Sequence, residues 1–449
     1  MFDATFIKKA SKLAWPISVQ SILVTLLGMI DIIMVSHLGD TSVAAVGVSN
    51  RIFFVFLVIV TGIASGVGVL SSQYYGAGRT NKIKSTIIMA IAFALCVVVP
   101  IVVLNFFYAA DVVALASADD SVIALGEDYL WITMPSLFFI AIIIIFENAL
   151  RGTGQVKLPM VFSILAIGLN IVLNYWLING GLGVEAMGVE GAAWATTISR
   201  LFHLCIIVYC LKIISHAVFP KRESFTEINN RKSWKKFIKL IFPIMISFGV
   251  WSLGTFVYQI IYGQMGTTEL AVMSMLTPIE GVLIAFFIGF SSACSILVGN
   301  MLGADDFTSA WKTSVTFSIG APITTFVLAI VLYSLQDFVF MPFQLMTEET
   351  IILATEIFLL IIFGTSIKVF NMTMSMGILR AGGDTKHCLL IDFVGMWVIS
   401  IPLTFLAAFY FNLPLFWVVV TAYSEEICKA VMFTIRMRQK RWLRNLAVD

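Results

Sequence analysis

The chain has 449 residues, of which 59% are hydrophobic and only 12% are charged. A soluble globular domain carries about 25% charged residues, so this composition excludes an ordinary soluble domain. The formal net charge is only +2, which does not indicate binding to nucleic acid.

Apolar runs long enough to cross a bilayer recur along the whole chain, as in a protein with many membrane-spanning helices. A transmembrane barrel would instead show alternating segments of about ten residues. We therefore predict an all-α integral membrane protein with twelve transmembrane helices. In chain order, the predicted spans are 13–35, 44–70, 85–107, 128–149, 158–178, 188–213, 240–262, 271–298, 312–334, 352–376, 388–409 and 413–435.

Lys and Arg mark one side of this predicted membrane protein. They gather before the first span, in alternate loops, in the long 214–239 segment and in the basic tail, whereas the intervening loops contain neither residue. Because positive loops face the cytoplasm, both termini and the 214–239 loop are predicted to be cytoplasmic. The expected location is the plasma membrane. The N-terminus lacks the pattern of a cleaved signal peptide, so we expect the first span to be retained.

The first span contains a proline and an acid. Pro16 stands near its start and is a candidate hinge, because proline weakens the helical hydrogen-bond ladder. Asp31 lies near the opposite end, where an ionisable group is costly. Apolar surroundings favour the neutral form of a carboxyl, so Asp31 is a candidate proton- or cation-coupling group. The alternative is a structural carboxylate paired with a neighbouring helix.

Spans 4 to 6 add polar side chains. Asn170 and Asn174 are four residues apart and share one helix face, and Asn148 and Thr196 lie in the neighbouring spans. Together with Asp31 they supply oxygen and amide groups, which suit a hydrogen-bond network or a hard cation such as Na⁺ but not a transition metal. The alternative is that these side chains only join helices to one another.

The second half carries other charges within its predicted spans. Glu280 and Lys368 are candidates for a polar cavity or an internal ion pair, with structure favoured over substrate binding. Further charges at membrane level are Asp392, Glu425, Glu426 and Lys429.

The chain repeats itself at an offset of 227 residues, which takes Pro16 to Pro243, and later at 229, which takes Arg151 to Arg380. Six spans, an even number, return the chain to the side of the membrane on which it started, so the two halves are predicted to have the same orientation. Internal repeats with a site between them are typical of secondary transporters. The expected domains are an N-terminal six-helix lobe (1–213), a connecting loop (214–239) and a C-terminal six-helix lobe (240–449). The two lobes are chemically unequal, because the offset replaces Asp31 by Tyr258.

An ordered set of motifs resembles the multidrug and toxic compound extrusion (MATE) family. The matching features are Pro16 with Asp31, HLG, QYYGAG, LRGTGQ, N-x-x-x-N in span 5, GAAWATT and LRAGGDT. The resemblance covers essentially the whole chain. It implies two six-helix lobes that export organic cations in exchange for H⁺ or Na⁺, and it places Asn148, Asn170, Asn174 and Thr196 around Asp31.

The family branch stays open on these motifs. Trp251 stands where the NorM-like branch carries an acid, and Asn174 stands where the DinF-like branch often has Asp. The DinF-like branch is favoured. Tyr258 and Trp251 join Glu280 and Lys368 as candidate cavity residues of the second half.

The leading hypothesis is a secondary active multidrug efflux antiporter that works by alternating access. The alternative is a flippase for a lipid-linked or polysaccharide precursor of the related superfamily. The four His residues are scattered without ligand or catalytic spacing, so no enzyme activity, metal site or cofactor is expected beyond the coupling ion. The expected partners are amphipathic organic cations and membrane lipid, and the expected state is a monomer.

Overall fold

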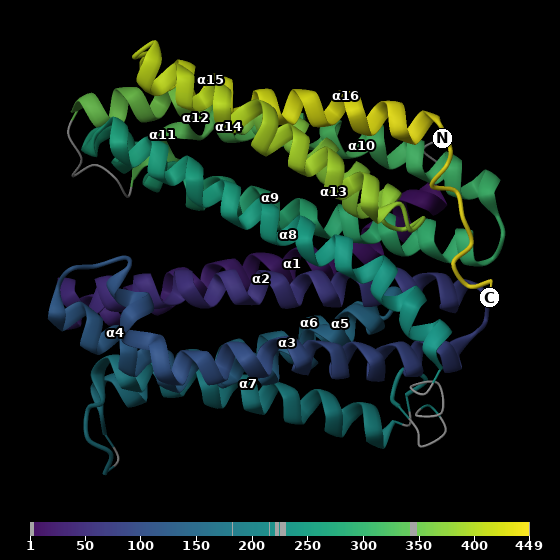
Figure 1. Ribbon diagram of the computed structural model, residues 1–449, viewed down its shortest axis with the longest axis horizontal. Coiled ribbons are helices and arrows are strands. Elements are labelled where there is room, and N and C mark those ends of the chain that lie inside the picture. The colour runs from purple at the N-terminus through teal and green to yellow at the C-terminus, as the bar shows by residue number, and fades with distance from the viewer. Residues whose placement is uncertain are drawn as a thin grey trace. The chain divides into compact units, whose positions relative to one another are not determined.

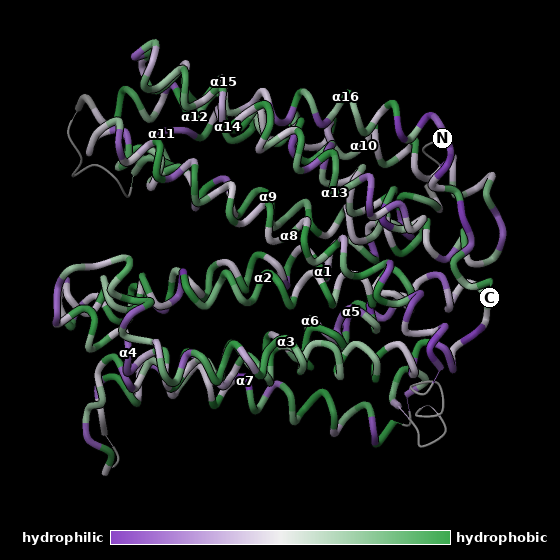
Figure 2. The backbone as a smooth tube through the Cα atoms, viewed as in Figure 1, coloured by the Kyte–Doolittle hydropathy of each residue, from purple (hydrophilic) through white to green (hydrophobic). Residues whose placement is uncertain are grey.

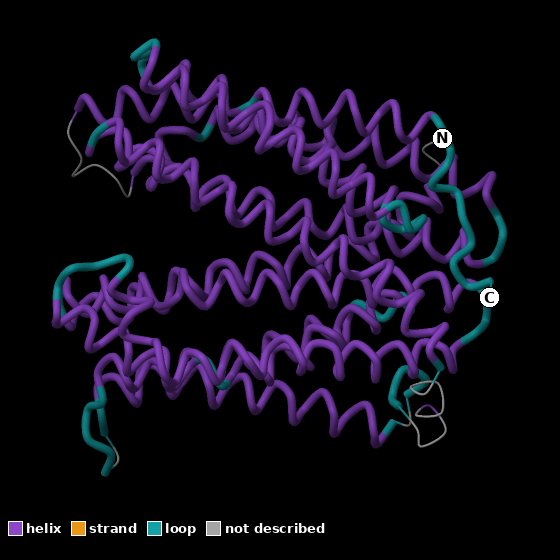
Figure 3. Tube along the Cα trace, in the orientation of Figure 1, coloured by secondary structure: helices purple, strands orange, loops and turns teal. Residues whose placement is uncertain are grey.

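The computed structural model describes residues 4–181, 183–214, 216–220, 224, 230–341 and 348–448. Over these residues the chain is helical apart from short turns and a single isolated bridge between Gly181 and Val184 (Figure 3). The predicted all-α fold class is confirmed. Residues 215, 221–223 and 225–229 of the predicted 214–239 loop lie outside the described residues.

The helices of the first half follow the predicted spans but extend beyond them, because their polar ends continue the same hydrogen-bond ladder. They are α1 (Ala4–Val35), the short 3₁₀ helix η1 (Ser36–Leu38), α2 (Asp40–Gly76), α3 (Thr80–Ala114), α4 (Asp120–Thr133), α5 (Ser136–Gly152), α6 (Lys157–Asn179) and α7 (Gly188–Ile213).

The second half starts earlier than predicted, because α8 begins inside the predicted connecting loop (Figure 1). Its elements include three π-helical segments, η4 to η6. They are α8 (Arg231–Met265), α9 (Thr267–Gly303), α10 (Phe307–Ser334), α11 (Gln336–Phe340), α12 (Glu348–Met372), η4 (Thr373–Leu379), α13 (Thr385–Phe393), η5 (Val394–Ser400), α14 (Ile401–Phe405), η6 (Leu406–Tyr410), α15 (Leu415–Ala422) and α16 (Ser424–Arg438).

All twelve predicted spans correspond to helical segments. Among the described residues, ten helical stretches are long and apolar enough to cross a membrane, and α4 with α5 forms an eleventh, bent by 48°. Pro135 lies at this bend, where its ring interrupts the helix. The last predicted span, 413–435, is divided between α15 and α16 at Tyr423. Green apolar stretches run along most of these helices in Figure 2.

The chain forms two compact units. The N-terminal unit comprises residues 22–245, and the C-terminal unit comprises residues 1–21 and 246–449. Helices α1 and α8 therefore each contribute to both units. The boundary between the units lies a few residues after Pro16 in α1, and a few residues after Pro243 in α8. The functional lobes 1–213 and 240–449 stay a prediction.

Equivalent turns in the two halves have the same hydrogen bonds. In the first half, the backbone N–H of Gln155 donates to the carbonyl of Leu150 at 3.0 Å. In the second half, the N–H of Asp384 donates to the carbonyl of Leu379, also at 3.0 Å. These residues are related by the 229-residue offset, so the repeat read from the sequence is present in the backbone of each unit.

Left-handed backbone also recurs at equivalent positions. Gly154 has φ 80° and its equivalent Gly383 has φ 79°, while Gly78 has φ 70° and its equivalent Asp305 has φ 60°. Glycine adopts this conformation without a steric cost, and Asp tolerates it better than most residues. The two halves therefore have the same backbone conformation at these turns, even where the residue type differs.

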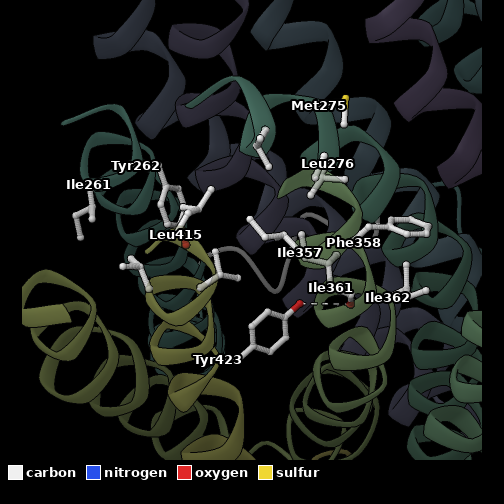
Figure 4. Packing of buried hydrophobic residues seen from close by; sticks show 14 of the residues in the cluster. Ile261, Tyr262, Met275, Leu276, Ile357, Phe358, Ile361, Ile362, Leu415 and Tyr423 are labelled. Carbon is white, nitrogen blue, oxygen red and sulfur yellow. Dashed lines mark hydrogen bonds between the residues drawn. The ribbon is translucent and has the colours of Figure 1, made fainter. Parts of the chain in front are cut away.

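An apolar cluster of the C-terminal unit joins α8, α9, α12 and α15. Ile261, Leu276, Phe358 and Leu415 are nearly or fully buried in this cluster. Figure 4 shows Tyr423 as a member of the cluster, with its hydroxyl donating to the carbonyl of Ile361 at 3.4 Å. The polar end of Tyr423 thus reaches from the apolar cluster toward the charged groups described below.

The basic tail packs on the turns of the C-terminal unit. Trp442 is fully buried, and its indole N–H donates to the carbonyl of Met437 at 3.1 Å. A Cβ atom added to Gly382 would lie only 1.8 Å from the carbonyl oxygen of Trp442. Asn445 donates to the carbonyl of Gly303 at 3.2 Å. The tail is therefore a fitted part of this unit.

Candidate functional site

The N-terminal unit brings Asp31 together with the two asparagines of α6. The amide nitrogen of Asn174 donates to Asp31 Oδ1 at 2.7 Å and to Asn170 Oδ1 at 3.0 Å. Asn174 is fully buried and Asn170 is 3% exposed. Their spacing of four residues puts both amides on one face of α6, and that face receives the carboxylate of α1.

The second polar atom of Asn174 has no protein partner. Within the described chain, Asn174 Oδ1 is buried and accepts no hydrogen bond. Both hydrogens of the amide nitrogen are already directed at acceptor oxygens, which fixes the orientation of the amide. The site therefore contains carboxylate and amide oxygens, one of which, Asn174 Oδ1, accepts no hydrogen bond from the described residues. Such an arrangement suits a proton or a hard cation. The described residues contain no cluster of three or more His, Cys, Asp or Glu able to hold a metal.

A second layer of polar groups lies around Asp31. Tyr129 of α4 is 2% exposed and donates to Asn50 Oδ1 at 3.2 Å. Its hydroxyl also has a hydrogen-bonding interaction with Thr196. Arg200 of α7 interacts electrostatically with both Asp31 and Tyr129. Thr196 thus reaches the predicted site through Tyr129.

Arg200 is itself held by neighbouring helices. Its guanidinium donates to Ser136 Oγ at 2.6 Å and lies 4.3 Å from the ring centroid of Phe53. The site residues predicted from the sequence did not include Tyr129, Asn50 or Ser136. Each of the three is a polar residue inside or beside an apolar run, which the sequence does show. The sequence does not show which neighbouring helix each side chain faces.

Asn148 has a different environment from the one predicted. Its amide nitrogen donates to the carbonyl of Ile144 in its own helix at 2.8 Å. The neighbouring residue, Glu147, accepts from Ser163 at 3.1 Å and lies 3.8 Å from Arg151. Asn148 turns back onto α5 because its own carbonyl ladder offers an acceptor one turn away.

In the C-terminal unit, Glu280 and Lys368 form an ion pair. Lys368 Nζ lies 2.6 Å from Glu280 Oε1 and 4.8 Å from the ring centroid of Tyr423. Tyr423 also donates to Glu280 Oε1 at 3.4 Å. The internal ion pair is therefore the arrangement observed for these two residues. Trp251 is 44% exposed.

Tyr258 belongs to a different group of the same unit. Its hydroxyl lies 2.7 Å from Ser400 Oγ and donates to Glu425 Oε2 at 3.0 Å. Glu425 is paired with Lys429 one turn along α16, and Lys429 also lies 3.8 Å from Asp392 Oδ1. An acid is therefore present beside Tyr258, but a lysine neutralises it.

Asp392 connects this group of charged residues to Arg380. Arg380 lies 3.4 Å from Asp392 Oδ2, and Ser247 donates to the same oxygen at 2.5 Å. Arg380 also donates to Ser247 Oγ at 2.9 Å and lies 5.2 Å from the ring centroid of Phe248. Arg380 directly follows the last residue of η4 and is a buried partner of Asp392.

Apolar helical spans in two repeated halves, with a carboxylate that accepts a hydrogen bond from a buried amide, are typical of a multi-pass membrane transporter of the internal-repeat class. A family model described as MatE matches residues 16–176 and 243–406, one stretch in each half. The chain belongs to the MatE family. The resemblance stated from its motifs is confirmed.

Relatives span nearly the whole chain. The "Uncharacterized transporter YisQ" of Bacillus subtilis (strain 168) is 25% identical over 460 residues, which cover 99% of this chain and 98% of that protein. The "Probable multidrug resistance protein NorM" of Thermotoga maritima is 26% identical, covering 97% and 93% of the two chains. The name of the first describes a transporter, and that of the second a probable multidrug resistance protein.

A solved structure supports the fold. The crystal structure of a mutant of the Vibrio cholerae MATE transporter VcmN matches with a TM-score of 0.87 at 18% identity, covering 98% of this chain and 99% of that chain. The DinF-like branch stays a prediction.

Proposed function

We propose that this protein is a secondary active multidrug antiporter that exports amphipathic organic cations in exchange for H⁺ or Na⁺ by alternating access. Family membership supports multidrug efflux. The observation that carries the antiport proposal is the contact between the Asp31 carboxylate and the buried, partly unpartnered amide of Asn174.

Asp31 is proposed as the coupling group because its direct partner is neutral. An amide donor stabilises a carboxylate without cancelling its charge, so Asp31 can attract an organic cation or a Na⁺ ion when ionised. After protonation the carboxyl becomes a donor, and Asn170 and Asn174 offer amide oxygens to receive it. A switch of this kind drives transport only if the two charge states differ in their stability in the two conformations.

Pro16 is proposed as the hinge of α1. It lies inside that helix, and the helix passes from one compact unit to the other a few residues later. A proline removes one backbone hydrogen bond and makes bending easier at that point. Neutralisation of Asp31 at the far end of α1 would then be relayed as a change in helix curvature.

The intramembrane cations favour export of cations over the flippase alternative. An anionic lipid-linked precursor needs unpaired positive charge at membrane level. Lys368 and Lys429 are instead paired with Glu280 and Glu425, and Arg200 lies close enough to Asp31 to interact with it electrostatically. We expect a monomer embedded in lipid to carry out the transport.

The test is efflux of a fluorescent organic cation from proteoliposomes under separately imposed pH and Na⁺ gradients. Asp31→Asn keeps the size of the side chain and removes its charge. We expect the parent to export with one of the two gradients, and Asp31→Asn to lose gradient-driven export while remaining folded.

Asp40→Asn is the matched control, because Asp40 is an exposed carboxylate at the start of α2. It should export like the parent. Parent-level export by Asp31→Asn at equal reconstitution would show that Asp31 is structural, and export of anionic lipid-linked sugars but not of cations would favour the flippase.

A further inference from the structure

The basic tail of the C-terminal unit has an apolar face and a charged face. In Figure 1 the tail is the yellow segment between α16 and the C-terminus. Trp442 is fully buried and Ala447 is 1% exposed, so these side chains face the protein. The basic side chains on either side of Trp442 are exposed instead, and they are Arg438, Lys440, Arg441 and Arg444. The tail is therefore fitted to its unit along one face and carries positive charge on the other.

The backbone of the tail follows a course that its contacts determine. Lys440 has a left-handed conformation with φ 55°, which is unfavourable for a residue with a Cβ atom. Its N–H donates to the carbonyl of Met437 at 3.0 Å, and its own carbonyl accepts from the N–H of Leu443 at 3.1 Å. Lys440 Nζ lies 4.8 Å from the ring centroid of Trp311, and that ring stacks on Trp442 with centroids 6.4 Å apart. The strained turn persists because the packing around it fixes it.

The acids beside the tail have partners within the same unit. Arg436 donates to both carboxylate oxygens of Asp384. Asn445 donates to Asp305 Oδ1 at 2.9 Å, and Asp306 caps the N-terminus of α10. These acids are therefore held by contacts other than the exposed basic side chains of the tail.

The exposed basic side chains have no acidic partner of their own. Among the residues that the structure describes, no ion pair includes Arg438, Lys440 or Arg441. They follow shortly after the last predicted span, on its predicted cytoplasmic side. The cytoplasmic leaflet carries anionic headgroups, and a cluster of Lys and Arg immediately beside a span is typical of proteins that bind them.

We propose that the exposed face formed by Arg438, Lys440 and Arg441 binds the phosphate of an anionic phospholipid in the cytoplasmic leaflet. A guanidinium donates two parallel hydrogen bonds to phosphate oxygens, and the ammonium of Lys440 adds a compact positive charge. A zwitterionic headgroup has the same phosphate but also carries a cation, which this basic face repels. Because the buried Trp442 already fixes the backbone, little backbone freedom is lost on binding. The proposal does not rest on the proposed antiport.

The test is binding of short-chain phosphatidylglycerol to the purified, delipidated full-length protein in neutral detergent, measured by microscale thermophoresis. Short-chain phosphatidylcholine and inorganic phosphate are the comparison ligands. We expect phosphatidylglycerol to bind at least about tenfold more tightly than either of them, and added salt to weaken its binding. The triple variant Arg438→Gln, Lys440→Gln, Arg441→Gln should weaken that binding by about 10- to 100-fold.

The matched control is the triple variant Lys8→Gln, Lys9→Gln, Lys12→Gln. It removes the same number of exposed basic charges from the predicted cytoplasmic side, but at the other end of the chain, and it should bind like the parent. The proposal is overturned if the tail variant binds phosphatidylglycerol like the parent, or if the control loses as much binding as the tail variant. Binding of inorganic phosphate as tight as that of the lipid would also overturn it, because the tail would then be a site for free phosphate.

Discussion

The two units exchange an acid and a hydroxyl at equivalent positions. The N-terminal unit has Asp31 in α1 and Thr196 in α7. The C-terminal unit has Tyr258 at the equivalent of Asp31, and at the equivalent of Thr196 it has Glu425, to which Tyr258 donates a hydrogen bond. At this pair of equivalent positions the acid is therefore on the first helix in one unit and on the last helix in the other, and only in the C-terminal unit is a direct acid–hydroxyl hydrogen bond observed.

Asp31 and Glu425 have partners of different charge. Asp31 accepts from the neutral amide of Asn174, whereas Glu425 is paired with Lys429. A lysine attracts an ionised carboxylate directly. An amide offers no such fixed charge. The repeated backbone therefore does not determine which partner an acid has; the neighbouring side chains do.

The largest expected effect on stability comes from breaking the ion pair of the C-terminal unit. Lys368→Met leaves the largely buried Glu280 without its cation, and loss of one member of a buried pair costs about 3–5 kcal/mol. The N-terminal unit has Phe53 and Phe139 at the equivalent positions. Thermal unfolding of the purified protein measures the loss.

The double variant Glu280→Gln with Lys368→Met removes both charges and should recover part of this stability, since an apolar pair of similar volume can replace a buried ion pair. If Lys368→Met unfolds at the parent temperature, the pair has no structural role and the candidate-cavity interpretation gains support.

The second prediction concerns the partner of Asp31 in the N-terminal unit. Asn174→Leu removes the hydrogen bond to Asp31, and hydrogen bonds to charged groups contribute about 1.5–3 kcal/mol. We expect gradient-driven export to fall by about 10- to 100-fold, a range that follows from about 1.4 kcal/mol per factor of ten. Initial efflux rates from proteoliposomes measure it.

Asn179→Leu is the control for this change, because Asn179 ends the same helix and its amide donates only to the carbonyl of Tyr175 in α6. It should export like the parent. Equal export by Asn174→Leu and Asn179→Leu would remove the amide from the coupling mechanism.

A third prediction concerns the tail, which fits the C-terminal unit. Gly382→Thr introduces the residue found at the equivalent position 153 of the N-terminal half. Its Cβ would meet the Trp442 carbonyl, and overpacking of this kind costs about 1–3 kcal/mol. Tail protection in limited proteolysis should fall, together with the unfolding temperature.

Removal of residues 440–449 should make Gly382→Thr nearly neutral relative to the truncated parent, because the clash is with the tail alone. Gly168→Ala is a control without a clash, since no atom lies within 4 Å of the added Cβ. A full cost of Gly382→Thr in the truncated chain would place the requirement for glycine in the turn itself.

The smallest expected effect is a pH dependence at the turn between η4 and α13. Burial raises the pKa of Asp384, but the hydrogen bond from Arg436 and the charges of His387 and Arg436 outweigh it and hold the pKa below its ordinary value. Arg436 donates to the two carboxylate oxygens of Asp384 at 2.5 and 3.1 Å. The stabilisation is therefore present above the ordinary pKa of about 4 and lost as pH falls through the lower folded pKa.

We expect Asp384→Asn to lower the unfolding temperature at neutral pH, and the difference from the parent to shrink as the pH drops below about 4. Gln155 occupies the equivalent turn of the N-terminal half and does not titrate, so Gln155→Ala should give a difference that is independent of pH. A constant difference for Asp384→Asn would show that the ion pair with Arg436 does not form in solution.

The sequence alone determined the class of fold, the number of spans and the repeat. These depend on the free energy of placing apolar side chains in lipid and on backbone turns that need particular residues, both of which are local along the chain. The same locality explains why Asp31, Asn170 and Asn174 could be chosen as site candidates, because an acid and two amides in apolar helices are conspicuous without a partner in view.

Only the tertiary structure decided which groups meet. The bond from Asn174 to Asp31 joins residues 143 positions apart, and the amide of Asn371 reaches Glu426 across 55 positions. Such pairings depend on the rotation of each helix about its axis, which packing fixes and composition does not. For the same reason Asn148, although polar and in a neighbouring span, donates to the carbonyl of Ile144 in its own helix.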